Sequence, residues 1–378
     1  MKIGFDAKRA FQNNTGLGNY SRFVIDIISR FYEGNDYYLF APKKTANTRL
    51  QNLLTRKNVH CRFAGSLWKL FASLWRTITI KKQLKKEQIT VFHGLSNELP
   101  VGINQTGIRS VVTIHDLIFL RYPSYYAPID RLIYRIKFRY ACRVADQIIA
   151  ISECTKRDII SYFHIPEEKI AVVYQGCHPN FKQPVSSAQQ EEVVRKYALP
   201  AVFFLYVGTV EERKNLLLPV KALVHLPEDI HLVVVGKRTA YQKKVEHFIS
   251  AHHLSQRVHF YPQALFDDLP AFYHLAQVFI LPSRFEGFGI PVIESLSCGT
   301  PVIAAKGSCL EEAGGKHSIY IDPDNDLELA DKIALIRRDT DLARRMSEEG
   351  RKYVERFSDE AIACEFMRVY HEFSTEAQ

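Results

Sequence analysis

Two glutamates, Glu286 and Glu294, stand eight positions apart in a segment that also contains two glycines. Gly287 and Gly289 let the backbone approach a ligand closely, because glycine has no side chain. Pro291 can occupy the first turn of a helix, and the amides ahead of a helix bind anions. One carboxylate in the loop and one on the first helical turn could therefore hold hydroxyls at two places on one ligand. The alternative is an ordinary strand–turn–helix connection with solvated carboxylates.

A pair of cations, Arg213 and Lys214, follows Gly208 at the end of an apolar run over residues 202–207. The run predicts a strand, and the periodicity of residues 215–225 predicts a helix after it. Two cations at the amino terminus of a helix are unfavourable next to its positive end unless an anion lies between them. A diphosphate would satisfy both, with Arg213 bidentate and Lys214 as a point charge. The alternative is solvated surface charge.

Gly16 and Gly18 lie between a strand predicted at residues 2–6 and a helix predicted at residues 17–31. A strand, a glycine-rich turn and a helix also make up the dinucleotide-binding fingerprint. Here the third glycine of that fingerprint is replaced by Ser21, and no acidic residue ends the next predicted strand. The pattern therefore disfavours a hydride-transfer enzyme.

His115 and Asp116 directly follow a predicted strand at residues 110–114. The carboxyl ends of parallel strands are where an α/β cleft collects its functional groups. A single histidine at a strand end is also a common structural residue, so a functional and a structural interpretation of His115 both stay open from the residues alone.

The elements that must position these residues alternate between strands and helices along most of the chain. Strands that are apolar throughout and separated by helices are typical of parallel sheets covered on both faces. Expected strands cover residues 2–6, 37–40, 89–93, 110–114, 147–151 and 170–174, then 202–207, 231–235, 258–261, 278–281 and 301–304.

A polar segment at residues 178–190 separates the two blocks of strands and is typical of a linker. We therefore predict an α/β protein of two Rossmann-like, doubly wound domains that face a central cleft. Their expected ranges are 1–185 and 186–356, and an amphipathic helix within 357–378 is expected to pack back across the linker.

The positive charge is concentrated in the first half of the chain. Residues 1–185 hold 28 Lys and Arg against 13 Asp and Glu, and residues 186–378 hold 22 against 28. The halves thus carry +15 and −6. This asymmetry predicts an anionic partner for the first half, which could be a membrane surface, a phosphorylated substrate or nucleic acid. A solubilising surface is the alternative.

Residues 67–87 combine Trp68 and Trp75 with basic side chains, among them Lys81, Lys82, Lys85 and Lys86. Tryptophan and lysine on an amphipathic helix are typical of an interfacial membrane contact; the alternative is a core-facing helix with a solvated basic face. The chain has no apolar run of about 20 residues, and its first residues lack the apolar stretch of a signal peptide. We expect a cytoplasmic protein that contacts the inner membrane face peripherally.

The seven cysteines form no C-x-x-C pair, which argues against a disulfide framework or a structural zinc site.

The run EGFGIPVIE from Glu286 to Glu294, followed by Cys298-Gly-Thr-Pro-Val, resembles the E-x7-E signature of retaining glycosyltransferases of family four. The resemblance covers almost the whole chain and implies two Rossmann-like domains in the GT-B arrangement. It implies that Glu286 meets hydroxyls of the donor sugar, that Glu294 meets the nucleotide ribose, and that the amides of Gly287, Phe288 and Gly289 face the sugar and diphosphate.

The other motifs match the same family residue by residue. The stretch from Gly208 to Asn215 resembles the family's diphosphate-binding segment with Arg213 and Lys214, although Thr209 stands where many relatives carry an arginine. The loop with Gly16 and Gly18 resembles the loop that closes over the donor diphosphate. The resemblance places His115 close to the reacting carbon of the sugar.

The implied activity is transfer of a hexose from a nucleotide-sugar, with retention, without a metal and without a cofactor. The pattern Arg213-Lys214-Asn215 implies GDP-mannose as donor, and the basic half implies an anionic, lipid-linked glycan acceptor in cell-surface polysaccharide synthesis, not nucleic acid. Two alternatives stay open: a nucleotide-sugar epimerase of the same fold, and a non-catalytic nucleic-acid-binding protein.

Overall fold

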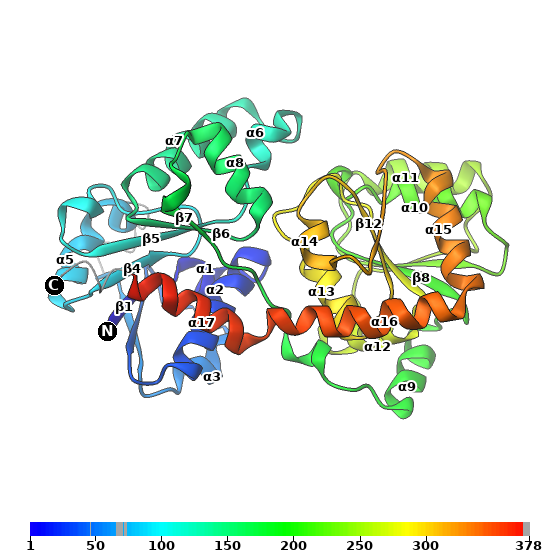
Figure 1. Cartoon of the computed structure of the whole chain (residues 1–378), viewed down its shortest axis with the longest axis horizontal. Helices are drawn as coiled ribbons and strands as arrows, with labels where there is room; N and C mark the ends of the chain where they lie inside the picture. The colour runs from blue at the N-terminus through cyan, green and yellow to red at the C-terminus, as the bar shows by residue number, and fades with distance from the viewer. Residues whose placement is uncertain (46, 66–70, 72–73, 373–378) are drawn as a thin grey trace. The chain divides into compact units, whose positions relative to one another are not determined.

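The computed structural model divides into two compact units, each built on one parallel sheet (Figure 1). It describes residues 1–45, 47–65, 71 and 74–372. Unit 1 comprises Met1–Gln175 together with Ser358–Gln378, and unit 2 comprises Gly176–Phe357. The prediction of an α/β protein with two doubly wound parallel sheets is confirmed.

The sheet of unit 1 has the strand order β3-β2-β1-β4-β5-β6-β7, with all neighbours parallel. Its strands are β1 Lys2–Asp6, β2 Asp36–Ala41, β3 Val59–Phe63, β4 Val91–Gly94, β5 Arg109–Ile114, β6 Gln147–Ala150 and β7 Ile170–Val172. The strand order reverses between β1 and β4, which creates a crevice at their carboxyl ends where α/β proteins bind ligands.

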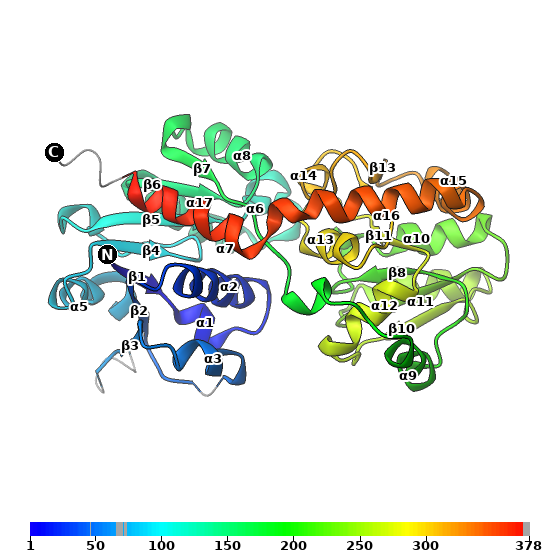
Figure 2. The same cartoon turned by 60° about the horizontal axis from the view of Figure 1, so that its bottom comes forward.

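Helices cover both faces of this sheet. They are α1 Lys8–Gln12, α2 Gly16–Phe31, α3 Gln51–Leu54, α5 Ile80–Lys86, α6 Ile118–Arg121, α7 Pro128–Val144, α8 Glu153–Phe163 and, from the end of the chain, α17 Asp359–His371. Helix α17 lies alongside α2, as both cartoon views show (Figures 1 and 2). The last helix therefore belongs to the first unit.

The sheet of unit 2 repeats the plan with the order β10-β9-β8-β11-β12-β13. Its strands are β8 Phe203–Val207, β9 His231–Val235, β10 Val258–Tyr261, β11 Val278–Leu281, β12 Val302–Ala305 and β13 Ile319–Ile321. The central strands β8, β11 and β12 are almost wholly buried, as expected for strands covered on both faces. Here the order reverses between β8 and β11.

The helices of unit 2 are α9 Ser187–Tyr197, α10 Leu217–Ala222, α11 Gln242–Ala251, α12 Leu269–Leu275, α13 Ile290–Ser297, α14 Leu310–Gly314, α15 Asp326–Arg338 and α16 Thr340–Val354. Local sequence explains where several begin: Ser186 and Gln189 form a capping box at α9, and Asn325 caps α15. Such caps satisfy backbone N–H groups that the first helical turn leaves without partners.

The boundary between the units falls between Gln175 and Gly176 rather than after residue 185. The reason is Phe181, a fully buried residue in the short 3-10 turn Pro179–Lys182. Its ring packs edge-on against Phe266 and Tyr273 of unit 2, at centroid distances of 5.7 and 5.8 Å. The polar segment expected to be a linker is thus anchored to unit 2 by one aromatic side chain.

The segment expected to place tryptophan at a membrane surface does not expose Trp75. This side chain is only 4% exposed and lies in the core of unit 1 with Ile80 and Leu84, while Lys82, Lys85 and Lys86 are exposed. Trp68 lies outside the described residues. The expectation is wrong for Trp75, because the same periodicity that suits a membrane face also suits a core.

No helix in the described ranges combines the length and apolar composition that crossing a bilayer requires.

Candidate functional site

The predicted residues of unit 2 gather where its strand order reverses. Arg213 and Lys214 follow β8, and Glu286 follows its neighbour β11. Because the carboxyl ends of neighbouring parallel strands meet at one edge of the sheet, side chains separated by more than seventy positions come into direct contact.

Glu286 is the centre of this contact. Its Oε2 accepts a hydrogen bond of 2.8 Å from Arg213 Nη1, and its Oε1 accepts one of 2.8 Å from Ser283 Oγ. Lys214 Nζ lies 3.2 Å from Oε1. The side chain is 14% exposed, and burial opposes its ionisation, yet Lys214 and Arg213 lower the pKa of Glu286 to about 2. Glu286 is therefore a fixed negative charge at neutral pH.

Arg213 has further partners that hold it in place. It donates to the carbonyl of Phe285 at 2.5 Å and to Glu211 Oε1 at 2.6 Å. The segment Glu212–Lys214 is a 3-10 turn and α10 begins only at Leu217. Both cations thus precede a helix as expected, but its first residue is Leu217 rather than Asn215. In this structure, the anion between them is Glu286.

The loop between the two glutamates is shaped by packing beneath it. Gly289 has φ +120°, and a Cβ there would lie 2.8 Å from Leu310 Cδ2, so this position requires glycine. Phe288 is buried, with its ring edge-on to Phe357 at 5.5 Å. The sulfur of Cys309 lies 3.0 Å from the carbonyl oxygens of both Glu286 and Phe288, so its one S–H hydrogen can be donated to either of them. The side chain of Phe288 thus anchors the loop whose backbone is predicted to face the donor.

Glu294 lies on α13 in a different environment. Tyr273 Oη donates a hydrogen bond of 3.0 Å to its Oε2. Burial raises the pKa of Glu294 to about 7, and the Tyr273 hydrogen bond and the charge of Lys214 only partly oppose the rise. The two glutamates of the motif therefore differ in charge near neutrality, although their spacing makes them look equivalent.

Gly208 lies directly against Lys214, since a Cβ at Gly208 would be 3.3 Å from Lys214 Cδ. Together Gly208, Arg213, Lys214, Glu286 and the 287–289 loop make one group at the carboxyl edge of the unit 2 sheet.

In unit 1, the two glycines before α2 have different surroundings. A Cβ at Gly18 would lie 1.8 Å from the carbonyl oxygen of Asn13, whereas a Cβ at Gly16 would meet nothing within 4 Å. The close approach of Asn13 therefore requires glycine at position 18. At Gly16 the space that a side chain would occupy is empty of protein atoms.

His115 is buried in unit 1. Its Nε2 lies 2.9 Å from the carbonyl oxygen of Leu95, and the ring of Tyr20 packs edge-on against it at 4.5 Å. Burial lowers the pKa of His115 to about 4. Because a carbonyl only accepts hydrogen bonds, the neutral ring carries its hydrogen on Nε2 and a lone pair on Nδ1.

The hydroxyl of Tyr20 is the first member of a buried chain of close polar contacts. Tyr20 Oη lies 3.0 Å from Thr113 Oγ1, Thr113 Oγ1 lies 2.8 Å from His93 Nε2, and His93 Nδ1 lies 2.7 Å from Tyr370 Oη. Burial lowers the pKa of His93 to about 3. The chain joins α2, β5, β4 and α17, and it was not predicted, because its members are far apart in sequence.

Other supporting residues were also missed. Ser283 carries a local signal, since it stands three positions before Glu286. Tyr273 and Cys309 carry none, because only the tertiary fold brings them to the loop and to Glu294.

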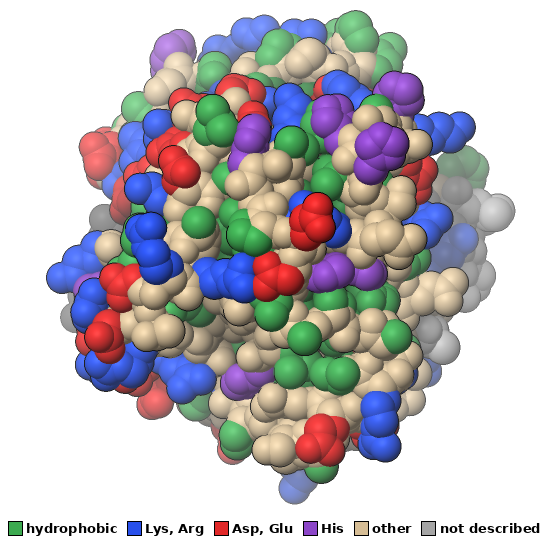
Figure 3. Space-filling model, turned by 90° about the vertical axis from the view of Figure 1, so that its right-hand side faces the viewer, with side chains coloured by type: hydrophobic (Ala, Val, Ile, Leu, Met, Phe, Trp, Pro, Cys, Tyr) green, Lys and Arg blue, Asp and Glu red, His purple; other side chains and the backbone are tan. Residues whose placement is uncertain are grey.

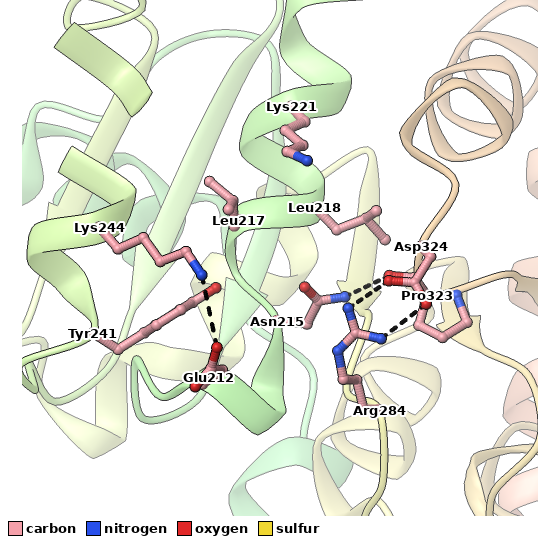
Figure 4. Close-up of a pocket in the computed structure, with 10 residues that line it drawn as sticks. All are labelled: Glu212, Asn215, Leu217, Leu218, Lys221, Tyr241, Lys244, Arg284, Pro323 and Asp324. Atoms are coloured by element: carbon pink, nitrogen blue, oxygen red, sulfur yellow. Dashed lines mark hydrogen bonds and ion pairs between the residues drawn. The ribbon is translucent and has the colours of Figure 1, made fainter. Parts of the chain in front are cut away.

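A cavity of about 220 Å³ lies beside the cation pair and is lined by Glu212, Asn215, Leu217, Leu218, Lys221, Tyr241, Lys244, Arg284, Pro323 and Asp324 (Figure 4). Arg284 pairs with Asp324 across it, and Asn215 donates to the carbonyl of Pro323 at 2.7 Å. No predicted site residue lines this cavity. Within the described ranges, no three His, Cys, Asp or Glu side chains are arranged as metal ligands.

Comparison with known proteins identifies both units. The family described as Glycosyltransferase Family 4 matches residues 22–181, and the family described as Glycosyl transferases group 1 matches residues 189–353. The O-antigen chain mannosyltransferase B of Escherichia coli is 27% identical over 346 residues, which cover 87% of this chain and 88% of that protein. The mannosyltransferase RfbU of Salmonella typhimurium is 25% identical over 277 residues, covering 73% of this chain and 72% of that protein.

Solved structures share the fold over nearly the full length. A glycosyltransferase from Rickettsia africae ESF-5 superposes with a TM-score of 0.76 at 18% identity, covering 98% of both chains. The Anabaena protein HepE, in complex with UDP and glucose, gives 0.74 at 19% identity, covering 98% of this chain and all of that one. Neither an epimerase nor a nucleic-acid-binding protein accounts for these matches, and the chain belongs to glycosyltransferase family four.

Proposed function

We propose that this glycosyltransferase transfers mannose from GDP-mannose, with retention and without a metal, to a lipid-linked glycan of the O-antigen kind. The observation that carries the proposal is the carboxylate of Glu286 held between Arg213 and Lys214 at the edge where β8 and β11 meet. The names of the similar mannosyltransferases from Escherichia coli and Salmonella typhimurium support mannose as the sugar and O-antigen as the product.

In this proposal the two cations serve the leaving group. Arg213 and Lys214 bind the donor diphosphate, Gly208 and the amides of residues 287–289 approach it, and Glu294 accepts a ribose hydroxyl. Positive charge fixed where negative charge develops lowers the barrier without reorganisation. Two side-chain cations supply that charge here, so the proposal needs no bridging metal and no cofactor.

The transfer itself uses no protein nucleophile. The bond between the anomeric carbon and the diphosphate oxygen breaks, the acceptor hydroxyl oxygen bonds to the same face of that carbon, and the hydroxyl proton passes to the departing phosphate. Glu286 binds sugar hydroxyls on the donor side. His115 stays neutral because of its burial, so it adds no positive charge beside a carbon that becomes cationic in the transition state.

The acceptor part of the proposal rests on unit 1. By sequence, this unit holds 28 Lys and Arg against 18 Asp and Glu, whereas unit 2 holds 22 against 23. A net charge of +10 on one unit favours an anionic acceptor and attraction to an anionic membrane surface on the cytoplasmic side.

The test is a donor screen on the purified protein. GDP-mannose should raise the melting temperature, because a ligand that binds only the folded state stabilises it, and slow release of GDP without acceptor should stop in Glu286→Gln. Stabilisation and turnover by UDP-glucose instead would overturn the choice of donor. No response to any nucleotide-sugar would overturn the assignment of the site.

A further inference from the structure

The cavity beside the cation pair is built like a ligand site of its own. Its walls are the turn after β8, the loops after β11 and β13, and the helices α10 and α11. The turn and both loops follow carboxyl ends of parallel strands, where α/β proteins bind ligands. The volume of about 220 Å³ is below the roughly 300–1,000 Å³ of pockets that take drug-sized molecules. The cavity therefore suits a small ligand.

Three basic side chains line this cavity, against two acidic ones. Arg284 is held by Asp324 through two contacts of 2.5 and 3.0 Å. Lys244 Nζ lies 3.7 Å from Glu212 Oε1, and both side chains are 62% exposed, so this ion pair contributes little and opens easily. The half-buried Lys221 has no partner for its ammonium group within the described part of the chain. Lys221 is therefore the surplus cation of the cavity.

The rest of the lining combines apolar surface with hydrogen-bond acceptors. Leu217, Leu218 and the ring of Tyr241 form an apolar wall (Figure 4), which can cover the carbon atoms of a ligand. The carboxylates of Glu212 and Asp324 accept hydrogen bonds from hydroxyl groups. A bare inorganic anion would use neither of these features. The lining favours a molecule that carries a negative group, a carbon framework and hydroxyls.

A lysine on the surface of unit 2 does not by itself mark a site. On the face seen in Figure 3, basic and acidic side chains are interspersed. Lys332 on α15 is half-buried like Lys221 but does not line the cavity. What distinguishes Lys221 is its place between an apolar wall and hydroxyl acceptors. Lys332 is therefore a matched control position.

We propose that this cavity binds a hexose phosphate, and that the bound hexose phosphate changes the affinity of the donor site. The phosphate oxygens accept hydrogen bonds from Lys221, and Lys244 adds positive charge beside them. The carbon atoms of the sugar ring lie against the apolar wall, and its hydroxyls donate to Glu212 and Asp324. This second site goes beyond the proposed transfer reaction, because none of its residues is assigned to the donor.

The cavity and the cation pair share one turn. The turn Glu212–Lys214 borders the cavity and also carries the two cations that contact Glu286. Asn215, the next residue, lines the cavity and is buried, and its amide donates to the carbonyls of Pro282 at 3.3 Å and Pro323 at 2.7 Å. A ligand that fixes this turn from the cavity therefore also fixes the cations. Because the binding free energies of two coupled sites are linked, each ligand changes the affinity of the other by the same factor.

The experiment is calorimetric titration with the 1-phosphates and 6-phosphates of mannose and glucose, and with mannose and inorganic phosphate as comparisons. Each titration is run with and without saturating nucleoside diphosphate, GDP or UDP as the donor screen selects, so that the donor site is filled in one arm. At least one hexose phosphate should bind with the donor site filled. Mannose and inorganic phosphate should each bind at least about tenfold more weakly, because each lacks part of the contacts. The affinity for the hexose phosphate should differ about fivefold or more between the two arms.

Lys221→Gln should weaken hexose phosphate binding at least about tenfold, the usual effect of losing a charged hydrogen bond. Lys332→Gln should bind like wild type. Both variants should keep the wild-type melting temperature, and without hexose phosphate both should release nucleoside diphosphate from the donor at the wild-type rate. A loss of binding in Lys221→Gln alone therefore concerns the cavity and not the fold or the donor site.

The site is refuted if no hexose phosphate binds with the donor site filled, if inorganic phosphate binds as tightly, or if Lys221→Gln binds like wild type. Equal affinity in the two arms refutes the coupling. A protein that binds hexose phosphate through Lys221 but turns over no nucleotide-sugar contradicts the proposed function and supports the second site.

Discussion

Tyr273 donates a hydrogen bond of 3.0 Å to Glu294, whereas Glu286, eight residues earlier, is held by two cations. The contact of Glu294 is a hydrogen bond from a neutral group, whereas Glu286 forms ion pairs. The two pKa values therefore differ in opposite directions from the ordinary value: that of Glu294 is raised to about 7 and that of Glu286 is lowered to about 2. Near neutral pH, the motif therefore presents one permanent negative charge and one group that can still lose a proton.

Glu294→Gln should change stability in a pH-dependent way. The folded protein holds the Glu294 proton more tightly than the unfolded chain, since its pKa rises from 4.5 to about 7. Wild-type stability therefore falls as pH rises from about 4.5 to 7. Allowing for partial exposure, the variant should gain about 2 kcal/mol relative to wild type between pH 5 and pH 8. Urea unfolding at both pH values measures this, and an equal difference at the two would contradict it.

Glu286→Gln should lower turnover by roughly 100-fold while the protein stays folded, because its interaction with the sugar strengthens in the transition state. Glu211→Gln is the matched control, since Glu211 pairs with the same Arg213 but is not assigned to the sugar. Kinetics with saturating donor, together with circular dichroism, separates the two. Equal losses of turnover would mean that both residues act only through Arg213.

Arg213→Ala and Lys214→Ala should each weaken nucleoside-diphosphate binding by about 1.5–3 kcal/mol, the usual contribution of a charged hydrogen bond. Calorimetric titration measures the loss, and Arg284→Ala, beside the neighbouring cavity, serves as control. Activity should also survive a chelator. Strong inhibition by chelator that magnesium or manganese reverses would refute the metal-free reaction.

Gly16→Ala and Gly18→Ala should separate the two glycines of the first unit. An added Cβ clashes with Asn13 at Gly18 but meets open space at Gly16. Gly18→Ala should therefore lower the melting temperature, while Gly16→Ala should keep it and raise the KM for the donor if the diphosphate approaches this loop. A Gly16→Ala enzyme with wild-type kinetics would remove Gly16 from the donor site.

His93 should make the protein sensitive to acid. Its pKa falls from 6.5 to about 3 on folding. Between these two pH values the unfolded chain therefore binds a proton at His93 and the folded protein does not. Stability is complete above pH 6.5 and should fall toward pH 3 by up to about 1.4 kcal/mol per pH unit. His93→Gln should flatten this slope at low pH. Tyr370→Phe should instead cost about 1–3 kcal/mol at every pH, because it removes a partner of a buried nitrogen.

Sequence alone predicted the features that depend on local spacing. The buried strands, the glutamate pair and the cation pair each lie in one short run of sequence. The residue types in each run are compatible with only a few local structures. The contacts of Tyr273 with Glu294 and of Tyr370 with His93 could not be predicted, because they join elements 21 and 277 positions apart.

The same spacing of apolar residues along a helix can also fit more than one environment. The pattern around Trp75 suited a membrane face and proved to be core, whereas α7 has apolar residues on two sides, and sequence cannot tell which side the fold covers. The helix expected at residues 215–225 begins later, at Leu217, because the backbone of Asn215 is left-handed, with φ +56°.

The membership of α17 in unit 1 has a consequence for biosynthesis. Residues 1–175 emerge from the ribosome before residues 358–371 have been synthesised. The nascent first unit therefore lacks the helix that carries Tyr370. Until translation has passed the whole of unit 2, His93 Nδ1 lacks the hydroxyl of Tyr370 and α2 lacks its neighbour α17. The first half to be synthesised is thus the last to be completed, and a fragment ending at residue 175 would expose apolar surface to chaperones.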